Sequence, residues 1–269
     1  MHHVFVYGSL QRDQFNHRYL YGASFLGRNY LAGARLHSLG SYPMAVLDPD
    51  PGAVIHGEVY RVDPQGLALL DQLEGHPDFY ERQLITLANG QQAWVYLGEE
   101  EKVVDREPVP FGSWGTTPVL SYGSNMNPER LESRCRGWDG NAVVARLEGW
   151  RWGINKLASS GSGRGCAGIT PEEGAHCWGV VHHLSPEDLA VLDSYEGVGF
   201  GHYRHEMVRV ATREGYSFEV LTYVPEDKAL AEGLLPEPSY ADHILIGAEH
   251  YGLPSDWRKR LQASLVITA

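Results

Sequence analysis

Two short patterns that could do chemistry each occur twice in this chain. One is a Tyr-Gly-Ser tripeptide, at Tyr7-Gly8-Ser9 and at Tyr122-Gly123-Ser124, and the other is a Glu-Gly pair, at Glu74-Gly75 and Glu196-Gly197. A glycine loop that follows a buried strand lets backbone N–H groups approach an anion closely. Such donors suit a carboxylate or a developing oxyanion, and a nearby carboxyl group can transfer protons. Together the patterns predict a site for proton transfer beside a bound anion.

The expected setting of the two glutamates favours proton transfer near neutral pH. Each follows a predicted helix, whose carboxyl end is partially negative and disfavours a second negative charge. Burial would raise the pKa of a carboxyl group in the same direction. Alone, a Tyr-Gly-Ser tripeptide is usually a turn and a glutamate after a helix is usually solvated. Their joint recurrence favours a role for Glu74 and Glu196 as general base and acid.

The elements that position these residues are themselves repeated. The pattern Leu67-Ala68-x-Leu70-Asp71-x-x-Glu74-Gly75 returns as Leu189-Ala190-x-Leu192-Asp193-x-x-Glu196-Gly197. Asp63-Pro64 and Ser185-Pro186 precede the two copies, as a cap and a first helical residue, and the glycines suit a left-handed helix end. The offset between the two copies is 115 residues at the tyrosines (122 minus 7) and 122 at the glutamates (196 minus 74), which indicates a duplicated domain rather than a solenoid. A duplicated domain also keeps fold residues, and we expect Asp71 and Asp193 to serve the helix end.

Strands are predicted around each helix. Val4 to Tyr7 is a short apolar run that opens into a loop, and Val54 to Val62 is a further strand. Tyr80 to Ala88 and Ala93 to Leu97 form a hairpin about Asn89-Gly90. Tyr80 with Arg82, and Tyr203 with Arg204, begin the next strand in each copy, and we expect the arginines to pack rather than to act in the site.

The organisation follows from the repeat. We predict a first domain over residues 1–98, a linker over 99–117 rich in charge, proline and glycine, and a second domain over 118–269. The second domain ends in a helical extension, amphipathic from Tyr240 to His250 and followed by a helix from Ser255. The glycine-rich segment from Ser159 to Gly165 is either a surface hairpin or a lid over a ligand.

Composition limits the function classes. The formal charge of −12 opposes nucleic-acid binding, and no apolar run reaches 18 residues, so no membrane span is expected. The amino terminus lacks the features of a signal peptide, and three unpaired cysteines suit a reducing cytosol. The thirteen histidines show no convincing metal-ligand spacing, so no metal is expected. We expect a cytoplasmic monomer whose two domains face each other across a modest interface.

The repeated residues resemble the γ-glutamylcyclotransferase superfamily, with a different branch in each half. The first half looks like the AIG2-like and γ-glutamylamine cyclotransferase group, through Val6-Tyr7-Gly8-Ser9-Leu10, Asn16-His17-Arg18, Tyr42-Pro43, Gly57-Glu58-Val59-Tyr60 and Leu70-Asp71-x-x-Glu74-x-x-Pro77-x-x-Tyr80-x-Arg82. The second half is similar to γ-glutamylcyclotransferase proper, through Tyr122-Gly123-Ser124-Asn125-Met126, Asn155-Lys156, Trp178-Gly179-Val180-Val181, Glu196-Gly197-Val198 and Gly247-Ala248-x-x-x-Gly252-Leu253-Pro254.

The resemblance implies an α+β protein with two tandem domains, each a small mixed β-barrel with flanking helices. It implies an enzyme that uses no cofactor and no metal. The free α-amine of a small γ-glutamyl substrate attacks its own side-chain carbonyl, which forms 5-oxoproline and releases an amine or amino acid. Glu74 and Glu196 would move the protons. Residues implied in substrate binding are Tyr7, Gly8, Ser9, Leu10, Leu120, Ser121, Tyr122, Gly123, Ser124, Asn125 and Tyr240.

Three readings remain open from the sequence. Both domains could be active, one could be active while the other is a scaffold or a carboxylate-binding module, or the chain could bind a carboxylate ligand without turnover. The substrate is equally open, between γ-glutamyl amino acids, γ-glutamyl amines including the isopeptide to lysine, glutathione, and a γ-glutamyl-protected biosynthetic intermediate. The presence of a glutamate in both copies favours two active sites.

Overall fold

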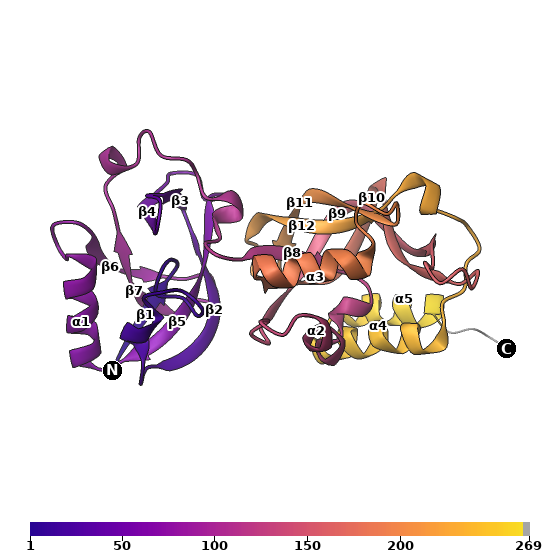
Figure 1. Ribbon diagram of the computed structural model, residues 1–269, viewed down its shortest axis with the longest axis horizontal. Coiled ribbons are helices and arrows are strands. Elements are labelled where there is room, and N and C mark those ends of the chain that lie inside the picture. The colour runs from indigo at the N-terminus through magenta and orange to yellow at the C-terminus, as the bar shows by residue number, and fades with distance from the viewer. Residues whose placement is uncertain (266–269) are drawn as a thin grey trace. The chain divides into compact units, whose positions relative to one another are not determined.

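The computed structural model describes residues 1–265 and divides the chain into two compact units, Met1–Gly115 and Thr116–Ala269 (Figure 1). The segment 99–117, expected as a linker, lies in unit 1 as far as Gly115. Val103 and Val109 in this segment are buried, and the backbone N–H of Val109 donates to the carbonyl of Leu36 at 2.8 Å. Charge, proline and glycine in this segment therefore belong to a packed surface coil of unit 1.

Unit 1 is built on a five-stranded sheet of order β2-β5-β1-β7-β6, in which β1 and β7 are parallel and the other neighbours are antiparallel. The expected hairpin about Asn89-Gly90 is present between β6 and β7. A backbone hydrogen bond of 3.0 Å from Ala88 to Tyr30 links the two ends of this sheet. The strands are β1 (His2–Val6), β2 (Ser24–Ala32), β5 (Val54–Val62), β6 (Glu81–Thr86) and β7 (Gln92–Leu97), beside the two-stranded sheet β3 (Ala34–Ser38) and β4 (Pro43–Leu47).

The central strand β1 has apolar side chains on both faces, which explains its continuous apolar sequence. Val4 and Val6 belong to one core cluster, together with Leu70 of the helix, and Phe5 and Tyr7 belong to the other. Successive side chains of a strand point to opposite faces. The loop that follows β1 is thus anchored at its base by packing on both sides of the sheet.

Helix α1 (Pro64–Glu74) forms where the sequence predicts it and sits against the sheet of unit 1 (Figure 1). The Asp63 side chain accepts a hydrogen bond from the N–H of Gly66 at 2.7 Å, and Gly75 ends the helix in the left-handed conformation with φ of 63°. Glu74 is consequently the last helical residue. Three 3₁₀ turns complete unit 1: η1 (His17–Leu20), η2 (Glu100–Lys102) and η3 (Pro110–Gly112).

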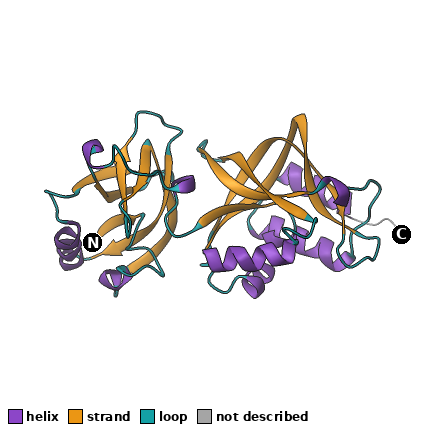
Figure 2. Cartoon of the chain, turned by 45° about the horizontal axis from the view of Figure 1, so that its top comes forward, coloured by secondary structure: helices purple, strands orange, loops and turns teal. Residues whose placement is uncertain are grey.

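Unit 2 contains a closed five-stranded barrel, as expected for a mixed β-barrel (Figure 2). The strand order around the barrel is β10-β8-β12-β11-β9, with β8 and β12 parallel. Read from β9, this order is β9-β10-β8-β12-β11, which matches β2-β5-β1-β7-β6 of unit 1 strand for strand. Pairing of β11 with β9 closes the barrel. The strands are β8 (Thr117–Ser121), β9 (Ala142–Leu157), β10 (Gly165–Leu184), β11 (Tyr203–Thr212) and β12 (Ser217–Pro225).

The helices of unit 2 repeat and extend the plan. In α3 the Ser185 hydroxyl accepts from the N–H of Asp188 at 3.1 Å and Gly197 ends the helix with φ of 67°, so Glu196 takes the place that Glu74 has in α1. No helix within residues 1–265 is both long and apolar enough to cross a membrane. The helices are η4 (Ser124–Met126), α2 (Pro128–Arg134), α3 (Pro186–Glu196), η5 (Asp227–Ala229), α4 (Pro238–His250) and α5 (Ser255–Leu265).

One repeated glycine serves the fold rather than the chemistry. A Cβ atom on Gly57 would lie 2.6 Å from the Phe5 ring, and one on Gly179 would lie 3.0 Å from Leu120. In each unit the glycine lets the strand that carries it lie close to the strand that leads into the Tyr-Gly-Ser loop.

Candidate active sites

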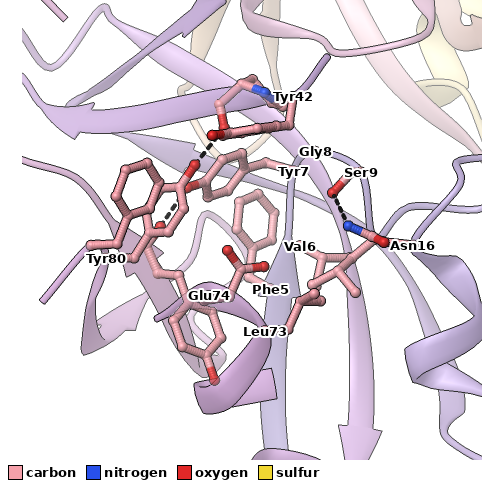
Figure 3. A pocket seen from close by; sticks show the side chains of 14 residues that line it. Phe5, Val6, Tyr7, Gly8, Ser9, Asn16, Tyr42, Leu73, Glu74 and Tyr80 are labelled. Atoms are coloured by element: carbon pink, nitrogen blue, oxygen red, sulfur yellow. Dashed lines mark hydrogen bonds between the residues drawn. The ribbon is translucent and has the colours of Figure 1, made fainter. Parts of the chain in front are cut away.

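A cavity of about 330 Å³ opens at the end of β1 in unit 1 (Figure 3). The loop from Tyr7 to Leu10 forms one wall, and the end of α1 with Glu74 forms another. Aromatic side chains make up most of the rest. The lining residues are Phe5, Val6, Tyr7, Gly8, Ser9, Leu10, Asn16, Tyr42, Pro43, Leu73, Glu74, Phe79, Tyr80 and Tyr96.

Glu74 is the one charged side chain among the residues that line this cavity. Its carboxylate points into the space beside the rings of Phe5 and Tyr7 (Figure 3). Burial raises the pKa of Glu74 to about 7. Within residues 1–265 no ion pair or hydrogen bond reaches this carboxylate to offset the burial. The group can therefore both accept and release a proton near neutral pH.

Tyr7 is fixed as a neutral phenol next to this glutamate. Its hydroxyl donates to the carbonyl of Tyr96 at 2.5 Å and accepts from the N–H of Ala45 at 3.4 Å. Burial, followed by the proximity of Tyr80 and Glu74, raises the pKa of Tyr7 well above its usual range. Tyr7 thus shapes the cavity and does not exchange protons at neutral pH.

Gly8 is required by close approach of the neighbouring strand. A Cβ atom at this position would lie 2.8 Å from the ring of Pro43, which is nearer than real Cβ contacts come. The Tyr80 hydroxyl donates to the carbonyl of Pro43 at 3.0 Å and holds that strand in place. Gly8 therefore lets the loop lie directly against Pro43, which also lines the cavity.

Asp71 and Asp193 connect the helix to the sheet, as expected. Asp71 accepts from Arg82 at 2.6 Å and from the Tyr96 hydroxyl at 2.8 Å. Asp193 accepts from the Tyr223 hydroxyl at 2.7 Å, and its second partner is His205, also at 2.7 Å.

The structure corrects the expectation that Arg82 and Arg204 simply pack, because each forms an ion pair. Arg82 forms an ion pair with Asp71 rather than serving in packing alone, although its guanidinium also lies 4.7 Å from the centre of the Trp94 ring. Arg204 pairs with Glu206 on its own strand at 2.9 Å. His205 is the counterpart of Arg82, because side chains alternate along a strand and position 204 points to the other face.

Unit 2 contains a cavity of about 280 Å³ at the matching place. The loop after β8 and the end of α3 form its walls, and α2, α4 and the strands β9, β10, β11 and β12 complete it. The lining residues are Leu120, Ser121, Tyr122, Gly123, Ser124, Asn125, Arg130, Arg134, Lys156, Ser159, Cys166, Ala167, Tyr195, Glu196, Tyr203, Tyr223 and Tyr240.

Glu196 has polar partners, unlike Glu74. The side-chain amide of Asn125 donates to its Oε1 at 2.9 Å, and Nη1 of Arg134 lies 3.6 Å from the same oxygen. Burial raises the pKa of Glu196, while the Asn125 hydrogen bond, Arg134, Lys156 and Arg130 act in the opposite direction.

Two further cations face this second cavity. Lys156 has only 3% of its surface exposed, and no carboxylate of residues 1–265 forms an ion pair with it. Its Nζ lies 4.9 Å from the centre of the Tyr203 ring, and burial lowers the pKa of Lys156. Nε of Arg130 is buried without a hydrogen-bond partner. The cavity of unit 2 is therefore cationic, whereas that of unit 1 is aromatic.

Every residue predicted for a site lines one of the two cavities. Tyr240, named from the family resemblance alone, accepts a hydrogen bond from the N–H of Ala167 at 2.9 Å and reaches the wall of the second cavity from α4. Of the glycine-rich segment from Ser159 to Gly165, Ser159 and no later residue lines the cavity.

Sequence reasoning missed Arg130 and Arg134. Their spacing of four residues places both on one face of a helix, and this helix directly follows the Tyr-Gly-Ser loop. That pattern is the signal that could have found them. The other lining residues that were not predicted for a site are, in unit 2, Lys156, Ser159, Cys166, Ala167, Tyr195, Tyr203 and Tyr223, and in unit 1, Phe5, Val6, Asn16, Tyr42, Pro43, Leu73, Phe79, Tyr80 and Tyr96.

Comparison with known proteins matches each unit to an AIG2-like family model. A family model described as γ-glutamyl cyclotransferase, AIG2-like, matches residues 4–116, and an AIG2-like family model matches residues 176–261. The chain is 46% identical over 111 residues to the γ-glutamylcyclotransferase family protein YtfP of Escherichia coli (strain K12), which covers 41% of this chain and 94% of that protein.

Two further similarities concern the γ-glutamylcyclotransferases themselves. The chain is 32% identical over 150 residues to γ-glutamylcyclotransferase of Mus musculus, which covers 54% of this chain and 76% of that protein. A solved structure of a γ-glutamyl cyclotransferase aligns with a TM-score of 0.50 and 29% identity, over 57% of this chain and 90% of the other.

Proposed function

Because this chain is an enzyme that belongs to the γ-glutamylcyclotransferase family, we propose that each of its two units converts a γ-glutamyl compound to 5-oxoproline. The observation that carries the proposal is the same in both units: a glutamate at the end of a helix faces the loop after a buried strand across a small cavity. Burial shifts the pKa of both carboxyl groups toward the neutral range.

The reaction needs two proton transfers, and one carboxyl group can perform both in turn. The α-amine nitrogen of the substrate forms a bond with the γ-carbonyl carbon and gives its proton to the glutamate. The bond between that carbon and the leaving nitrogen then breaks as the glutamate returns the proton to the leaving nitrogen. The atoms balance without an added reactant, so we propose that no cofactor takes part. Holding the substrate folded makes the attack intramolecular, which supplies much of the acceleration.

The loop backbone is the proposed donor set for the negative oxygens of the substrate. Gly8 and Gly123 allow the loop to approach a ligand closely, and both loops line their cavities. We assign the amides of Tyr7 to Leu10, and of Leu120 to Asn125, to the α-carboxylate and to the oxyanion that forms on the carbonyl.

The two cavities are suited to different leaving groups. Tyr42 and Phe79 line the first cavity, with 40% of Phe79 exposed, and no lysine or arginine joins them among the described residues. An amine without a carboxylate fits these surroundings, and aromatic faces also accept a cation. In the second cavity neither Lys156 nor Arg130 forms an ion pair with a carboxylate of residues 1–265, and this site therefore suits a leaving amino acid that places its carboxylate there.

Release of 5-oxoproline from a matched pair of substrates tests the proposal. We expect Glu74→Gln to reduce turnover of γ-glutamyl ethylamide, and Glu196→Gln to reduce turnover of γ-glutamyl-alanine, each by a factor on the order of 10²–10⁴. Lys156→Gln should impair only the substrate with the carboxylate. Loss of all activity from one glutamate variant would show that a single unit is active. No release from any γ-glutamyl compound, despite binding, would refute the catalytic proposal.

We also propose that the chain works as a monomer in the cytoplasm. Each cavity is lined entirely by residues of its own unit, so neither site needs a second copy. Cys135 and Cys177 are buried free thiols, which suit a reducing compartment. Sedimentation of a dimer at micromolar concentration would refute the monomer.

A further inference from the structure

We propose that Asn125, held in place by Arg134, is a positioning residue that favours the ionised form of Glu196, so that the two sites of this chain work in different pH ranges. The inference rests on the proposed role of the two glutamates in proton transfer. It goes beyond that role because it assigns to side chains that do not themselves transfer the proton a control over when each site is active.

The orientation of Asn125 is fixed by its neighbours. Nη1 of Arg134 donates to Oδ1 of Asn125 at 2.7 Å, and Nδ2 of Asn125 donates to Oε1 of Glu196 at 2.9 Å. Since arginine can only donate, it selects the amide orientation that presents the NH₂ group to the glutamate. A donor in that position stabilises the ionised form of a carboxyl group. Asn125 is 92% buried, with 8% exposed, so this contact is shielded from water.

Arg134 is itself constrained. It is the last residue of α2, and its guanidinium carbon lies 4.4 Å from the centre of the Tyr195 ring. Tyr195 precedes Glu196 in α3, so the ring and the carboxylate bring the same arginine against the helix end. The chain Arg134, Asn125, Glu196 therefore joins α2, the Tyr-Gly-Ser loop and α3.

The other charged groups around Glu196 act in the same direction. Lys156 of β9 and Arg130 of α2 both lower the pKa of Glu196, although less than Asn125 and Arg134 do. These cations offset part of the cost of burying the carboxylate.

The remaining titratable groups near Glu196 carry no charge at neutral pH. They are tyrosines in the loop after β8, on the strands β11 and β12 and on α4, together with one thiol on β10. Burial raises the pKa of each one. These groups are Tyr122, Tyr203, Tyr223, Tyr240 and Cys166.

Unit 1 lacks this arrangement altogether. Leu10 follows Ser9 where Asn125 follows Ser124, and Leu10 is buried with no group to donate. The titratable groups facing Glu74 are Tyr7 and Tyr80, whose own pKa values are raised by burial. The burial of Glu74 is therefore uncompensated, and its pKa is raised to about 7.

The two units should differ in the pH at which turnover rises, and the direction of this difference follows from the state of each glutamate. A general base must be ionised before it can take the substrate proton, so turnover in unit 1 should rise with pH through about 7. We expect Glu196 to ionise at lower pH than Glu74, because the Asn125 hydrogen bond and the nearby cations oppose the burial that raises the pKa of Glu196. The turnover of unit 2 should therefore reach its plateau at a lower pH than the turnover of unit 1.

Single-site chains test the inference. We would measure kcat/KM against pH for Glu196→Gln, in which unit 1 alone works, and for Glu74→Gln, in which unit 2 alone works. Asn125→Leu in the second chain copies the residue of unit 1, and we expect the acid limb of its kcat/KM profile to move up by about one pH unit, whatever the change in the height of the plateau. Arg134→Met should move the limb in the same direction. The matched control is Asn141→Leu, which lies outside the cavity.

Two results would overturn the inference: acid limbs that coincide in the two single-site chains, or an acid limb that stays in place in both Asn125→Leu and Arg134→Met. A titration that does not depend on turnover separates this failure from failure of the proposed function. With ¹³C-labelled glutamate, the resonance lost in Glu196→Gln identifies the Glu196 carboxyl group. Its midpoint should rise in Asn125→Leu even if no γ-glutamyl compound is turned over, and an unchanged midpoint refutes the role of Asn125.

Discussion

Replacing Glu74 by glutamine should stabilise unit 1 at alkaline pH while it removes the proposed catalytic group. The pKa of Glu74 is about 7 in the folded chain, against 4.5 in the open chain. Between these two values the folded state binds more protons than the unfolded state, so the free energy of unfolding falls as the pH rises. The contribution is fully present below about pH 4.5 and is lost as the pH passes through about 7.

The size of the effect follows from the same two values. A difference of about 2.5 in pKa corresponds to about 3 kcal/mol, at 1.36 kcal/mol for each pKa unit. Since Glu74 has no hydrogen bond or ion pair within residues 1–265, the glutamine variant loses no contact that would obscure this term. Glu74→Gln should therefore gain about 3 kcal/mol relative to the unmodified chain between pH 4 and pH 8.

Urea unfolding at a series of pH values measures this difference, with hydrogen exchange into unit 1 peptides used to assign the transition. Glu101→Gln is the control, because Glu101 is exposed and its loss removes the same formal charge from unit 1. A difference between Glu74→Gln and the unmodified chain that stays constant from pH 4 to pH 8 would refute the reasoning. It would mean that solvent screens Glu74 and that burial does not set its proton affinity.

Further outcomes can be checked with the same protein. Gly8→Ala should reduce turnover in unit 1 by at least tenfold, because its Cβ atom would lie 2.8 Å from Pro43. Gly123→Ala should have a smaller effect on unit 2, because its Cβ atom would lie 3.2 Å from Ala167. The kcat/KM value of each unit measures these effects. Asp71→Asn weakens the bonds to Arg82 and Tyr96 and should destabilise unit 1 by about 1–3 kcal/mol in urea unfolding, with no change in unit 2.

The sequence predicts best what local signals determine. The helix from Pro64 to Glu74 begins at a capping Asp63 and ends at Gly75, and its copy in unit 2 ends at Gly197 in the same way. Both end signals are readable without tertiary information. The position of each glutamate at a helix end could therefore be predicted, together with the loop that faces it.

Long-range packing determines the features that the sequence did not reveal. Arg134 reaches Glu196 because α2 packs beside α3. The spacing of Arg130 and Arg134 marks one face of α2, but nothing in the seven residues of this helix indicates that the face meets α3. The segment 99–117 has the composition of a linker, yet Val103 and Val109 insert into unit 1. Two buried side chains in a polar coil are too few to change its overall composition.

The two copies act as a comparison built into one chain, and their differences are as informative as their similarities. The glutamate and the Tyr-Gly-Ser loop occur in both, as the proposed reaction requires, and so does an aspartate that ties the helix to the sheet. The partners of that aspartate differ, however, since Arg82 serves Asp71 and His205 serves Asp193. A structural contact thus tolerates exchange of its partner as long as a donor remains. The change from Leu10 to Asn125 is of another kind, because it adds a donor to the proposed proton-transfer group itself. Repeated residues therefore indicate the reaction, and the unrepeated neighbours of the glutamates indicate how each site is adjusted.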